Sequence, residues 1–200
     1  MKSVLMSIQP KWCELIASGK KTVEVRKTKP KLETPFKVYI YCTKPRKFIR
    51  AGCGTYEDTL FLNPDTNEIK CDQPWELMCC EKDYSQDNFL NGKVIGEFVC
   101  DNIEIIEYNP SFYFMRHGAC LKVCELWDYG KGKTLYAWHI SNLVIYDKPR
   151  ELSEFWKCNY PFDCGVCDYF DGFTMSCEKP KRPPQSWCYV ESEVITNEQI

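Results

Sequence analysis

Three residues near the N-terminus could do chemistry together: Lys21, Glu24 and Arg26. A lysine amine can hold a phosphate as a mobile cation, and it becomes a nucleophile once it is neutral. An arginine offers a planar fork for bidentate contact with a phosphate or the edge of a base. A glutamate can accept a hydrogen bond from a base amino group or orient either cation. With neighbouring Lys20, these side chains are the predicted ligand-binding residues.

The segment around these residues alternates as a β-strand does. Polar residues at 22, 24 and 26 are separated by Val23 and Val25. In a strand this pattern puts Glu24 and Arg26 on one face and the valines on the other. The pattern also allows a plainer interpretation, in which Glu24 and Arg26 form an exposed ion pair on an edge strand. Such a pair contributes under about 1 kcal/mol to stability.

A strand, a short helix and a glycine turn precede this segment. Alternation over Ser3–Ile8 predicts a strand. Pro10 suits the first turn of a helix, because its missing N–H costs nothing there. Apolar residues at 12, 15 and 16 then form a helical stripe, and Gly19 follows where a left-handed cap is needed.

The rest of the chain reads mainly as short strands with one further helix. Many short strands with two short helices predict a small β-barrel with helical decorations. The expected elements are strands 36–42, 93–100, 103–108, 135–140, 143–146 and 187–190, a hairpin of 59–62 with 68–71, and a helix over Ala119–Tyr129.

At this point the chain resembles the ASCH family. The residues that carry the resemblance are Gly19-x-Lys21-x-x-Glu24-x-Arg26, the lead Ser7-Ile8-Gln9-Pro10-Lys11-Trp12, the strand Gly92–Phe98, and the segments Trp138–Ile140 and Tyr146–Pro149. The resemblance covers residues 3–43 and 92–156, and the whole chain looks like ASCH proteins often encoded by bacteriophages.

The resemblance implies a fold and a place for the ligand. It implies a mostly β (α+β) chain with a PUA-like β-barrel over residues 1–156. Turn signals separately predict an insertion near 44–92, and the clustered cysteines predict a cysteine-rich loop with a closing strand over 157–190. The resemblance also implies RNA recognition, with the signature residues lining a cleft. We therefore expect RNA or a modified nucleoside as the ligand.

The resemblance also leaves enzymatic roles open. Some small ASCH members hydrolyse the acetyl amide of acetylated cytidine with a lysine, a threonine three residues later and a distant glutamate. Lys21 matches the lysine, Glu24 occupies the threonine position, and Glu125 is a candidate for the distant carboxylate. A ribonuclease that uses the same cleft is a second alternative. A third is a protein-interaction role, such as a phage factor that engages a host complex through the insertion.

Charge is distributed unevenly along the chain. Residues 1–50 hold thirteen Lys and Arg against three acidic residues, whereas residues 51–200 hold thirteen against twenty-five. Clustered cations attract polyanions through counterion release, so nucleic acid is the first partner that the basic segment predicts.

Fourteen cysteines are present, and four near the C-terminus have spacings that suit a metal. Cys164 and Cys167 have the two-residue gap that lets two thiolates bind one ion, and Cys158 and Cys177 could complete a tetrahedral structural zinc site. The alternative is that these cysteines stay reduced and pack beneath aromatic residues. The sequence predicts no organic cofactor.

No apolar run approaches the roughly 20 residues needed to cross a bilayer. The apolar stretch at the N-terminus is too short for a signal peptide. We therefore expect a soluble protein of the cytoplasm with no membrane partner.

Overall fold

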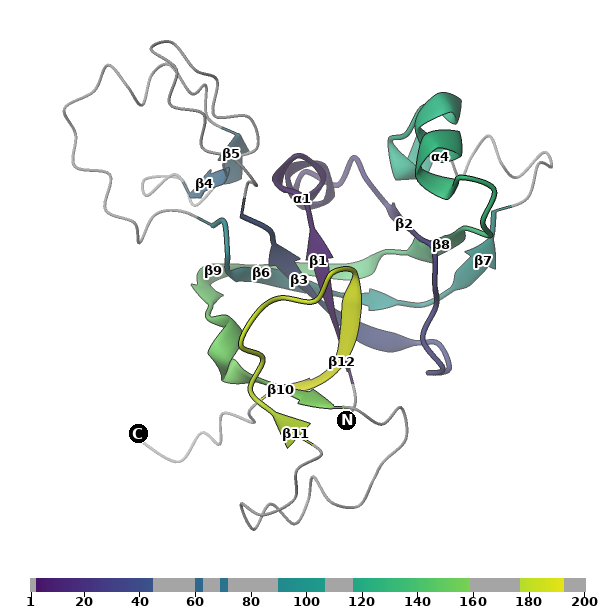
Figure 1. Ribbon diagram of the computed structural model, residues 1–200. Helices are drawn as coiled ribbons and strands as arrows, with labels where there is room; N and C mark the ends of the chain where they lie inside the picture. The colour runs from purple at the N-terminus through teal and green to yellow at the C-terminus, as the bar shows by residue number, and fades with distance from the viewer. Residues whose placement is uncertain are drawn as a thin grey trace, which may run out of the picture.

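The computed structural model describes residues 3–44, 90–106, 117–158 and 177–192, together with the backbone of a hairpin at 60–62 and 69–71. Strands dominate the fold (Figure 1). In chain order the elements are β1 (Ser3–Ile8), α1 (Pro10–Ala17), β2 (Val23–Arg26), β3 (Phe36–Cys42), β4 (Leu60–Leu62), β5 (Ile69–Cys71), β6 (Val94–Cys100), β7 (Ile103–Ile105), α4 (Val123–Gly130), β8 (Tyr136–His139), β9 (Ser141–Arg150), the 3-10 turn η2 (Leu152–Glu154), β10 (Phe155–Cys158), β11 (Cys177–Glu178) and β12 (Trp187–Ser192).

The strands form one large sheet and two small ones. The seven-stranded sheet has the order β11-β10-β12-β1-β3-β6-β9, the three-stranded sheet has the order β2-β8-β7, and β4 pairs with β5. β1 lies between β12, to which it is antiparallel, and β3, to which it is parallel. The mostly β fold is confirmed. Closure of the strands into one barrel is not: in the described part of the chain the sheets are separate and open.

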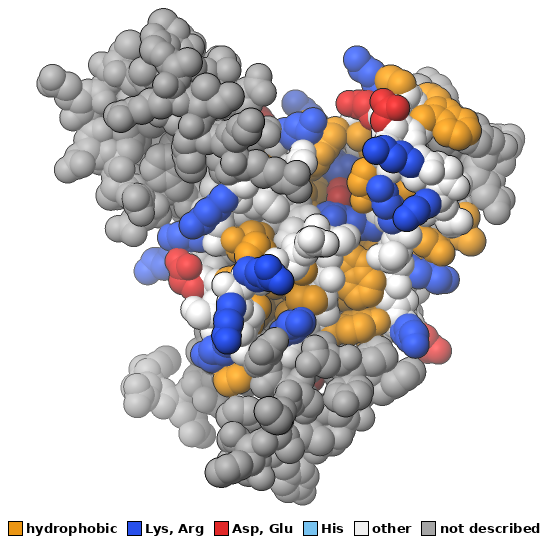
Figure 2. All heavy atoms as spheres, viewed as in Figure 1, with side chains coloured by type: hydrophobic (Ala, Val, Ile, Leu, Met, Phe, Trp, Pro, Cys, Tyr) orange, Lys and Arg blue, Asp and Glu red, His pale blue; other side chains and the backbone are white. Residues whose placement is uncertain are grey.

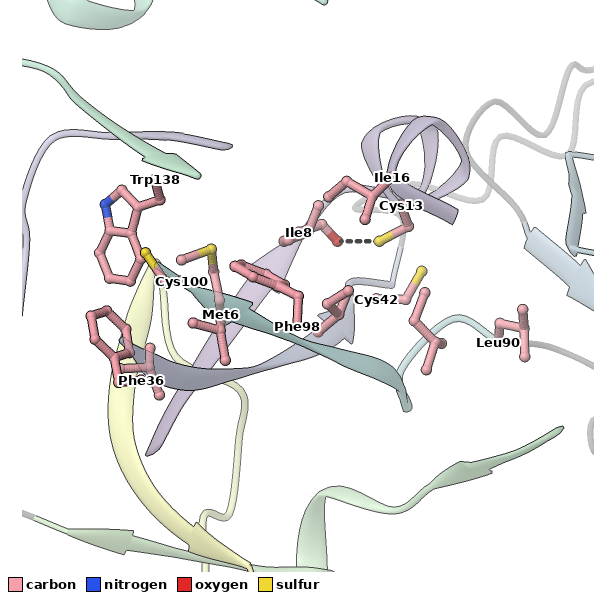
Figure 3. Packing of buried hydrophobic residues seen from close by; sticks show 14 residues of the cluster. Met6, Ile8, Cys13, Ile16, Phe36, Cys42, Leu90, Phe98, Cys100 and Trp138 are labelled. Carbon is pink, nitrogen blue, oxygen red and sulfur yellow. Dashed lines mark hydrogen bonds between the residues drawn. The ribbon is translucent and has the colours of Figure 1, made fainter. Parts of the chain in front are cut away.

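The main hydrophobic core lies beneath α1, where the two larger sheets meet (Figure 3). Trp138 of β8 is fully buried there, and its ring packs edge-on against Phe36 of β3, with 5.7 Å between ring centroids. The members of this cluster are Val4, Met6, Ile8, Cys13, Ile16, Phe36, Val38, Ile40, Cys42, Leu90, Ile95, Phe98, Cys100 and Trp138. The core therefore joins the three-stranded sheet to the large sheet.

The start and end of α1 follow the sequence prediction. Pro10 is its first residue, and Cys13 and Ile16 are buried in the core. Trp12 and Leu15, the other members of the predicted stripe, are only half-buried. Gly19 has φ +71°, and its N–H donates to the Ile16 carbonyl over 2.9 Å. A side chain at this φ would be strained, so glycine suits the turn from α1 toward β2.

The two faces of β2 separate as the alternation predicts. Val23 and Val25 join a second cluster with Ala119, Leu126, Leu135 and Ala137, beneath α4. Glu24 and Arg26 point to the opposite face, where their register partners on β8 are Trp138 and Tyr136. β2 therefore carries apolar packing on one side and two charges on the other.

The second helix begins later than predicted. Cys120 has φ 56°, in the left-handed region, and Lys122 is extended, so the regular helix starts at Val123. The carboxylate of Glu125 accepts from the Lys122 backbone N–H over 2.7 Å, which satisfies a donor at the helix start. The break at Cys120 has no sequence signal, because only a few per cent of non-glycine residues adopt positive φ.

Cysteines in apolar stretches are buried in only some places. Cys42 and Cys100 are buried, as expected of small apolar side chains. Cys120 is half-buried, and Cys124 is exposed on α4.

The predicted hairpin of the insertion is present as β4 and β5, with Leu60 opposite Cys71. Most other residues of 44–92 lie outside the described residues. No helix in the described ranges is both long and apolar enough to span a membrane.

Candidate functional site

Lys21 lies in the turn between α1 and β2 with its side chain turned inward. Only 2% of the residue is exposed, and its backbone N–H donates to the Leu15 carbonyl over 2.8 Å. The Nζ donates to the Ala119 carbonyl over 2.6 Å and lies 3.4 Å from Glu24 Oε2. It also lies 5.0 Å from the ring centroid of Trp12 on α1. The lysine is therefore fixed by contacts from three directions.

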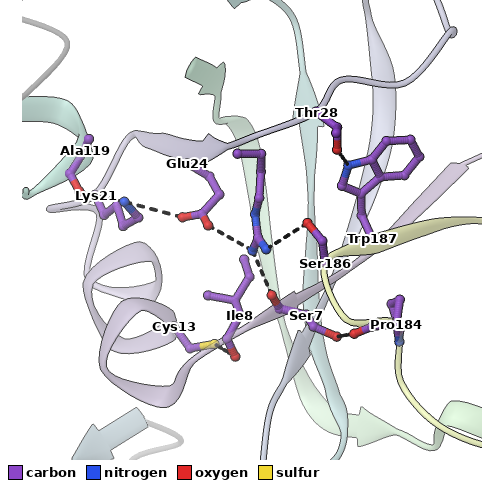
Figure 4. A network of polar contacts seen from close by, with 11 residues as sticks. Ser7, Ile8, Cys13, Lys21, Glu24, Thr28, Ala119, Pro184, Ser186 and Trp187 are labelled. Carbon is purple, nitrogen blue, oxygen red and sulfur yellow. Dashed lines mark hydrogen bonds and ion pairs between the residues drawn. The ribbon is translucent and has the colours of Figure 1, made fainter. Parts of the chain in front are cut away.

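Arg26 completes the network from the far end of β2 (Figure 4). One terminal nitrogen lies 2.9 Å from Glu24 Oε1 and donates to the Ser7 carbonyl of β1 over 2.7 Å. The other lies 3.4 Å from the hydroxyl oxygen of Ser186. The Nε is buried and has no hydrogen-bond partner among the described residues. Glu24 thus lies between two cations, and one donor of Arg26 is left over.

Burial decides what this network can be. Lys21, Glu24 and Arg26 are 2%, 6% and 7% exposed. The interpretation as an exposed edge-strand ion pair is therefore wrong. Removing one member of a buried set of charges leaves the others uncompensated, at a cost of about 3–5 kcal/mol. We call these three residues the signature network.

The segment that enters β12 forms one wall of the signature network. The Ser7 hydroxyl donates to the Pro184 carbonyl over 2.7 Å, and the Ser7 N–H donates to the Ser186 carbonyl over 2.9 Å. The indole N–H of Trp187 donates to the Thr28 hydroxyl over 2.9 Å. Sequence reasoning missed Ser7 and Ser186. The available signal for Ser7 was a hydroxyl residue between the apolar residues Met6 and Ile8.

Two further predicted residues lie apart from the signature network. Lys20 is exposed, and its backbone carbonyl accepts from the Cys120 thiol over 3.3 Å. Glu125 caps α4 through the Lys122 N–H, and no contact joins it to Lys21 in the described part of the chain.

Cys13, near the signature network, has the environment of a buried core residue. Cys13 of α1 is fully buried, and its Sγ lies 3.6 Å from the Ile8 carbonyl, to which it donates. Burial, and then a hydrogen bond with Cys42, raise the pKa of the Cys13 thiol well above its usual value. A thiol that holds its proton is a poor nucleophile, so this cysteine packs rather than reacts.

Aromatic rings with lysines over their faces surround the signature network. Lys11 Nζ lies 4.6 Å from the Trp12 ring centroid, and Lys27 Nζ lies 4.7 Å from that of Tyr129. Lys29 Nζ lies 5.8 Å from the Tyr136 ring. On this side of the molecule α1 and α4 stand on either side of β2 (Figure 1). Figure 2 shows a hollow between them, with Lys and Arg side chains around it and acidic atoms at its base.

Tyr129 of α4 lies within electrostatic range of the signature network. Burial raises the pKa of its phenol, the positive charge of Arg26 lowers it, and the negative charge of Glu24 raises it further. The residue is nevertheless 38% exposed. The phenol of Tyr129 is therefore influenced by the buried charges while part of the residue is in contact with solvent.

The described ranges 3–44, 90–106, 117–158 and 177–192 carry a net positive charge. They hold nineteen Lys and Arg against thirteen Asp and Glu. The remaining residues hold seven against fifteen, because the whole chain has 26 and 28. Residues 3–44 account for all of this excess, with nine basic residues against three acidic ones, because the other described ranges hold ten of each.

The predicted metal ligands are only partly in view. Cys158 of β10 and Cys177 of β11 are register partners in neighbouring antiparallel strands. Cys164 and Cys167 lie outside the described residues. Within the described residues, no group of three or more His, Cys, Asp or Glu side chains could hold a metal ion.

Comparison with known proteins supports the family resemblance. The family model described as "ASCH domain" matches residues 6–84. The crystal structure of ASCH from Zymomonas mobilis is similar with a TM-score of 0.50 and 17% identity, over 92% of this chain and 85% of that chain. A tyrosine-to-phenylalanine mutant of the Zymomonas mobilis protein has a TM-score of 0.45, also at 17% identity, over 94% and 88%. No curated protein matches the chain. At this identity the structural likeness shows the fold alone.

Proposed function

Since this chain carries an ASCH domain of PUA-like β fold, we propose that it binds RNA or a modified nucleoside at the face between α1 and α4. In this proposal the signature network forms the floor of the binding site, and exposed lysines such as Lys20 contact phosphates. ASCH domains are generally nucleic-acid-binding, which supports nucleic acid as the class of ligand.

One observation carries the proposal: the residues of the family signature meet in a single buried network beneath a rim of lysines and aromatic rings. Burying three charges is expensive, and apolar residues would stabilise a turn between α1 and β2 at lower cost. Arg26 also keeps a buried N–H without a partner among the described residues, which costs about 1–3 kcal/mol unless a water or a ligand accepts from it. These features are typical of a binding site for a polar ligand.

The contacts of Lys21 favour binding over hydrolysis. A nucleophilic amine must be neutral and must present its lone pair to the substrate. Lys21 Nζ instead donates to the Ala119 carbonyl and pairs with Glu24, so two acceptors within the protein already hold the amine. The acetylcytidine amidohydrolase with Lys21, Glu24 and Glu125 therefore stays the weaker hypothesis. The ribonuclease and protein-interaction roles also stay predictions.

A binding titration across salt concentrations tests the proposal. Labelled RNA should bind at low salt, and the logarithm of the affinity should fall linearly with the logarithm of salt, by about 0.7 per phosphate contact for a single strand. Lys20→Ala should weaken binding and make this slope shallower. Lys148→Ala, an exposed lysine of β9, is the matched control and should change neither. Absence of affinity for RNA, DNA and nucleosides at low salt would reject the proposal.

We also propose a structural zinc ion bound by Cys158, Cys164, Cys167 and Cys177. Four thiolates suit tetrahedral zinc, and the strand register brings the first and last of these residues opposite each other. Protein purified without chelator should contain about one equivalent of zinc. Cys158→Ser should lower this content, whereas Cys124→Ser, at the exposed cysteine of α4, should not. A zinc content below about a tenth of an equivalent would contradict the proposal.

A further inference from the structure

We propose that Trp12 and Tyr129 bind an unpaired base of single-stranded RNA by stacking, while Lys11 and Lys27 contact the flanking phosphates. This inference rests on the proposed function, because it names the form of RNA that the same face would take. It assigns binding to residues outside the signature network.

The charges of the signature network are already engaged within the protein, so RNA must be contacted by other residues. Lys21 Nζ donates to a carbonyl and pairs with Glu24, and both oxygens of Glu24 are paired with cations. Charges that are only 2–7% exposed cannot reach and neutralise the successive phosphates of a long anion. The contacts that give RNA most of its affinity must then come from the exposed side chains around the network.

The two rings belong to the two helices that flank the signature network in the ribbon view (Figure 1). Trp12 approaches from α1, with its ring centroid 5.0 Å from Lys21 Nζ. Tyr129 approaches from α4, where its phenol interacts electrostatically with Arg26 and Glu24. Figure 1 shows α1 and α4 on either side of β2, the strand that carries these charges. A base that enters between the helices would meet an aromatic ring from either side.

Each ring already attracts a cation to its face. Lys11 Nζ lies 4.6 Å from the Trp12 centroid, and Lys27 Nζ lies 4.7 Å from the Tyr129 centroid. Both lysines are exposed, so their long side chains can swing away at little cost. A base would then take the ring face, and each ammonium group would move to a phosphate. Aromatic rings for bases and lysines for the backbone are the combination that single-stranded nucleic acids require.

The same arrangement disfavours duplex RNA. In a duplex both faces of each internal base are covered by its neighbours, so no face is left for a protein ring. Proteins recognise A-form duplexes mostly through shape, 2′-hydroxyls and phosphates across the shallow minor groove. Side-chain rings at either side of a buried polar floor match a splayed-out base instead.

The test compares one labelled RNA oligonucleotide, as a single strand and annealed to its complement, on the full chain. The single strand should bind at least about tenfold more tightly than the duplex. Trp12→Ala and Tyr129→Ala should each weaken single-strand binding by about 5- to 150-fold, the range measured for losing one stacked base. Tyr129→Phe keeps the ring and should bind within about twofold of the unchanged protein.

Trp127→Ala is the matched control. Trp127 is also an exposed aromatic residue of α4, but it lies two positions from Tyr129, and about 100° per residue puts it on the other side of the helix. It should leave binding unchanged. Trp12 also packs against the core, so Trp12→Leu, which keeps apolar volume, and a thermal melt show whether loss of binding follows loss of the ring or loss of the fold.

The outcomes separate this inference from the proposed function. If the unchanged protein binds RNA but Trp12→Leu and Tyr129→Ala bind equally well, or if the duplex binds as tightly as the single strand, the stacking inference is overturned and the proposed function stands. If the unchanged protein binds no RNA, both are rejected.

Discussion

Two clusters in this protein use the same chemistry in different surroundings. In the signature network, Glu24 lies between Lys21 and Arg26, and the three side chains are 2–9% exposed. On the large sheet, Glu97 of β6 accepts from Lys37 of β3 and from the hydroxyl of Tyr146 of β9. There the side chain of Lys37 is 43% exposed and that of Glu97 is 21% exposed.

The difference shows that a short distance is a poor guide to energetic weight. The Lys37–Glu97 contact, at 2.6 Å, is shorter than the 3.4 Å between Lys21 and Glu24. Water and salt screen the first pair, and water can replace either partner if it is lost. The second pair has no such substitute, because both groups are buried. We therefore expect solvent access, more than contact distance, to determine how much Glu24 and Glu97 each contribute to stability.

The largest expected effect comes from Glu24→Gln. Glutamine keeps the volume but removes the negative charge between two buried cations, so we expect the free energy of unfolding to fall by about 3–5 kcal/mol. Urea denaturation monitored by circular dichroism measures this loss. A loss below about 1 kcal/mol would mean that the signature network behaves like the exposed cluster, and the comparison would fail.

Glu97→Gln is the matched change in the exposed cluster, and we expect it to cost under about 1 kcal/mol at neutral pH. Its pH dependence is more informative. Burial alone would raise the pKa of Glu97, but hydrogen bonds from Lys37 and Tyr146 outweigh it and leave this pKa below its usual value.

The sign of the pH effect follows from that lowered pKa. The stability that Glu97 contributes is fully present above its unfolded pKa, about 4.3, and is lost as pH falls through the lower folded value. From pH 6 to pH 3, Glu97→Gln should therefore lose less unfolding free energy than the unchanged protein, as shown by urea denaturation at each pH. Parallel losses in the two proteins would show that the carboxylate is not stabilised by its neighbours.

The smallest effect is expected from Lys37→Met, which removes a cation but keeps an apolar stem. We expect a change of a few tenths of a kcal/mol, reduced further in about 1 M salt, where the Debye length is about 3 Å. Thermal melts at low and high salt measure the difference. A loss of stability that stays large in high salt would indicate that the Lys37–Glu97 pair is desolvated. The two clusters would then not differ in energy as proposed.

The sequence predicts the local part of this site better than the long-range part. Pro10 and Gly19 mark the helix and its end because both act through their own backbone angles. Alternation fixes the faces of β2, because the period of a strand is two residues. Burial of Lys21 depends on the Ala119 carbonyl, 98 positions along the chain, and no local pattern reveals that contact.

The order of strands in the sheets could not be predicted from the sequence either, because it also depends on long-range contacts. Most short strands could be located by their alternation, but the order of strands and the openness of the sheets depend on pairings between distant segments. Ser186 is 160 positions from the arginine it contacts. The loop at Cys120 differs in kind, because a left-handed backbone favours glycine, asparagine or aspartate, and a cysteine at that position does not predict it.

Because Pro184, Ser186 and Trp187 form one wall of the site, the site cannot fold completely early in translation. A ribosome releases β1, α1 and β2 long before β12, so the nascent chain holds the charges of the signature network while Ser7 still lacks its neighbours. One edge of β1 stays unpaired during that interval, and unpaired strand edges invite association with other chains. Final assembly of the site must therefore wait until translation has passed residue 187.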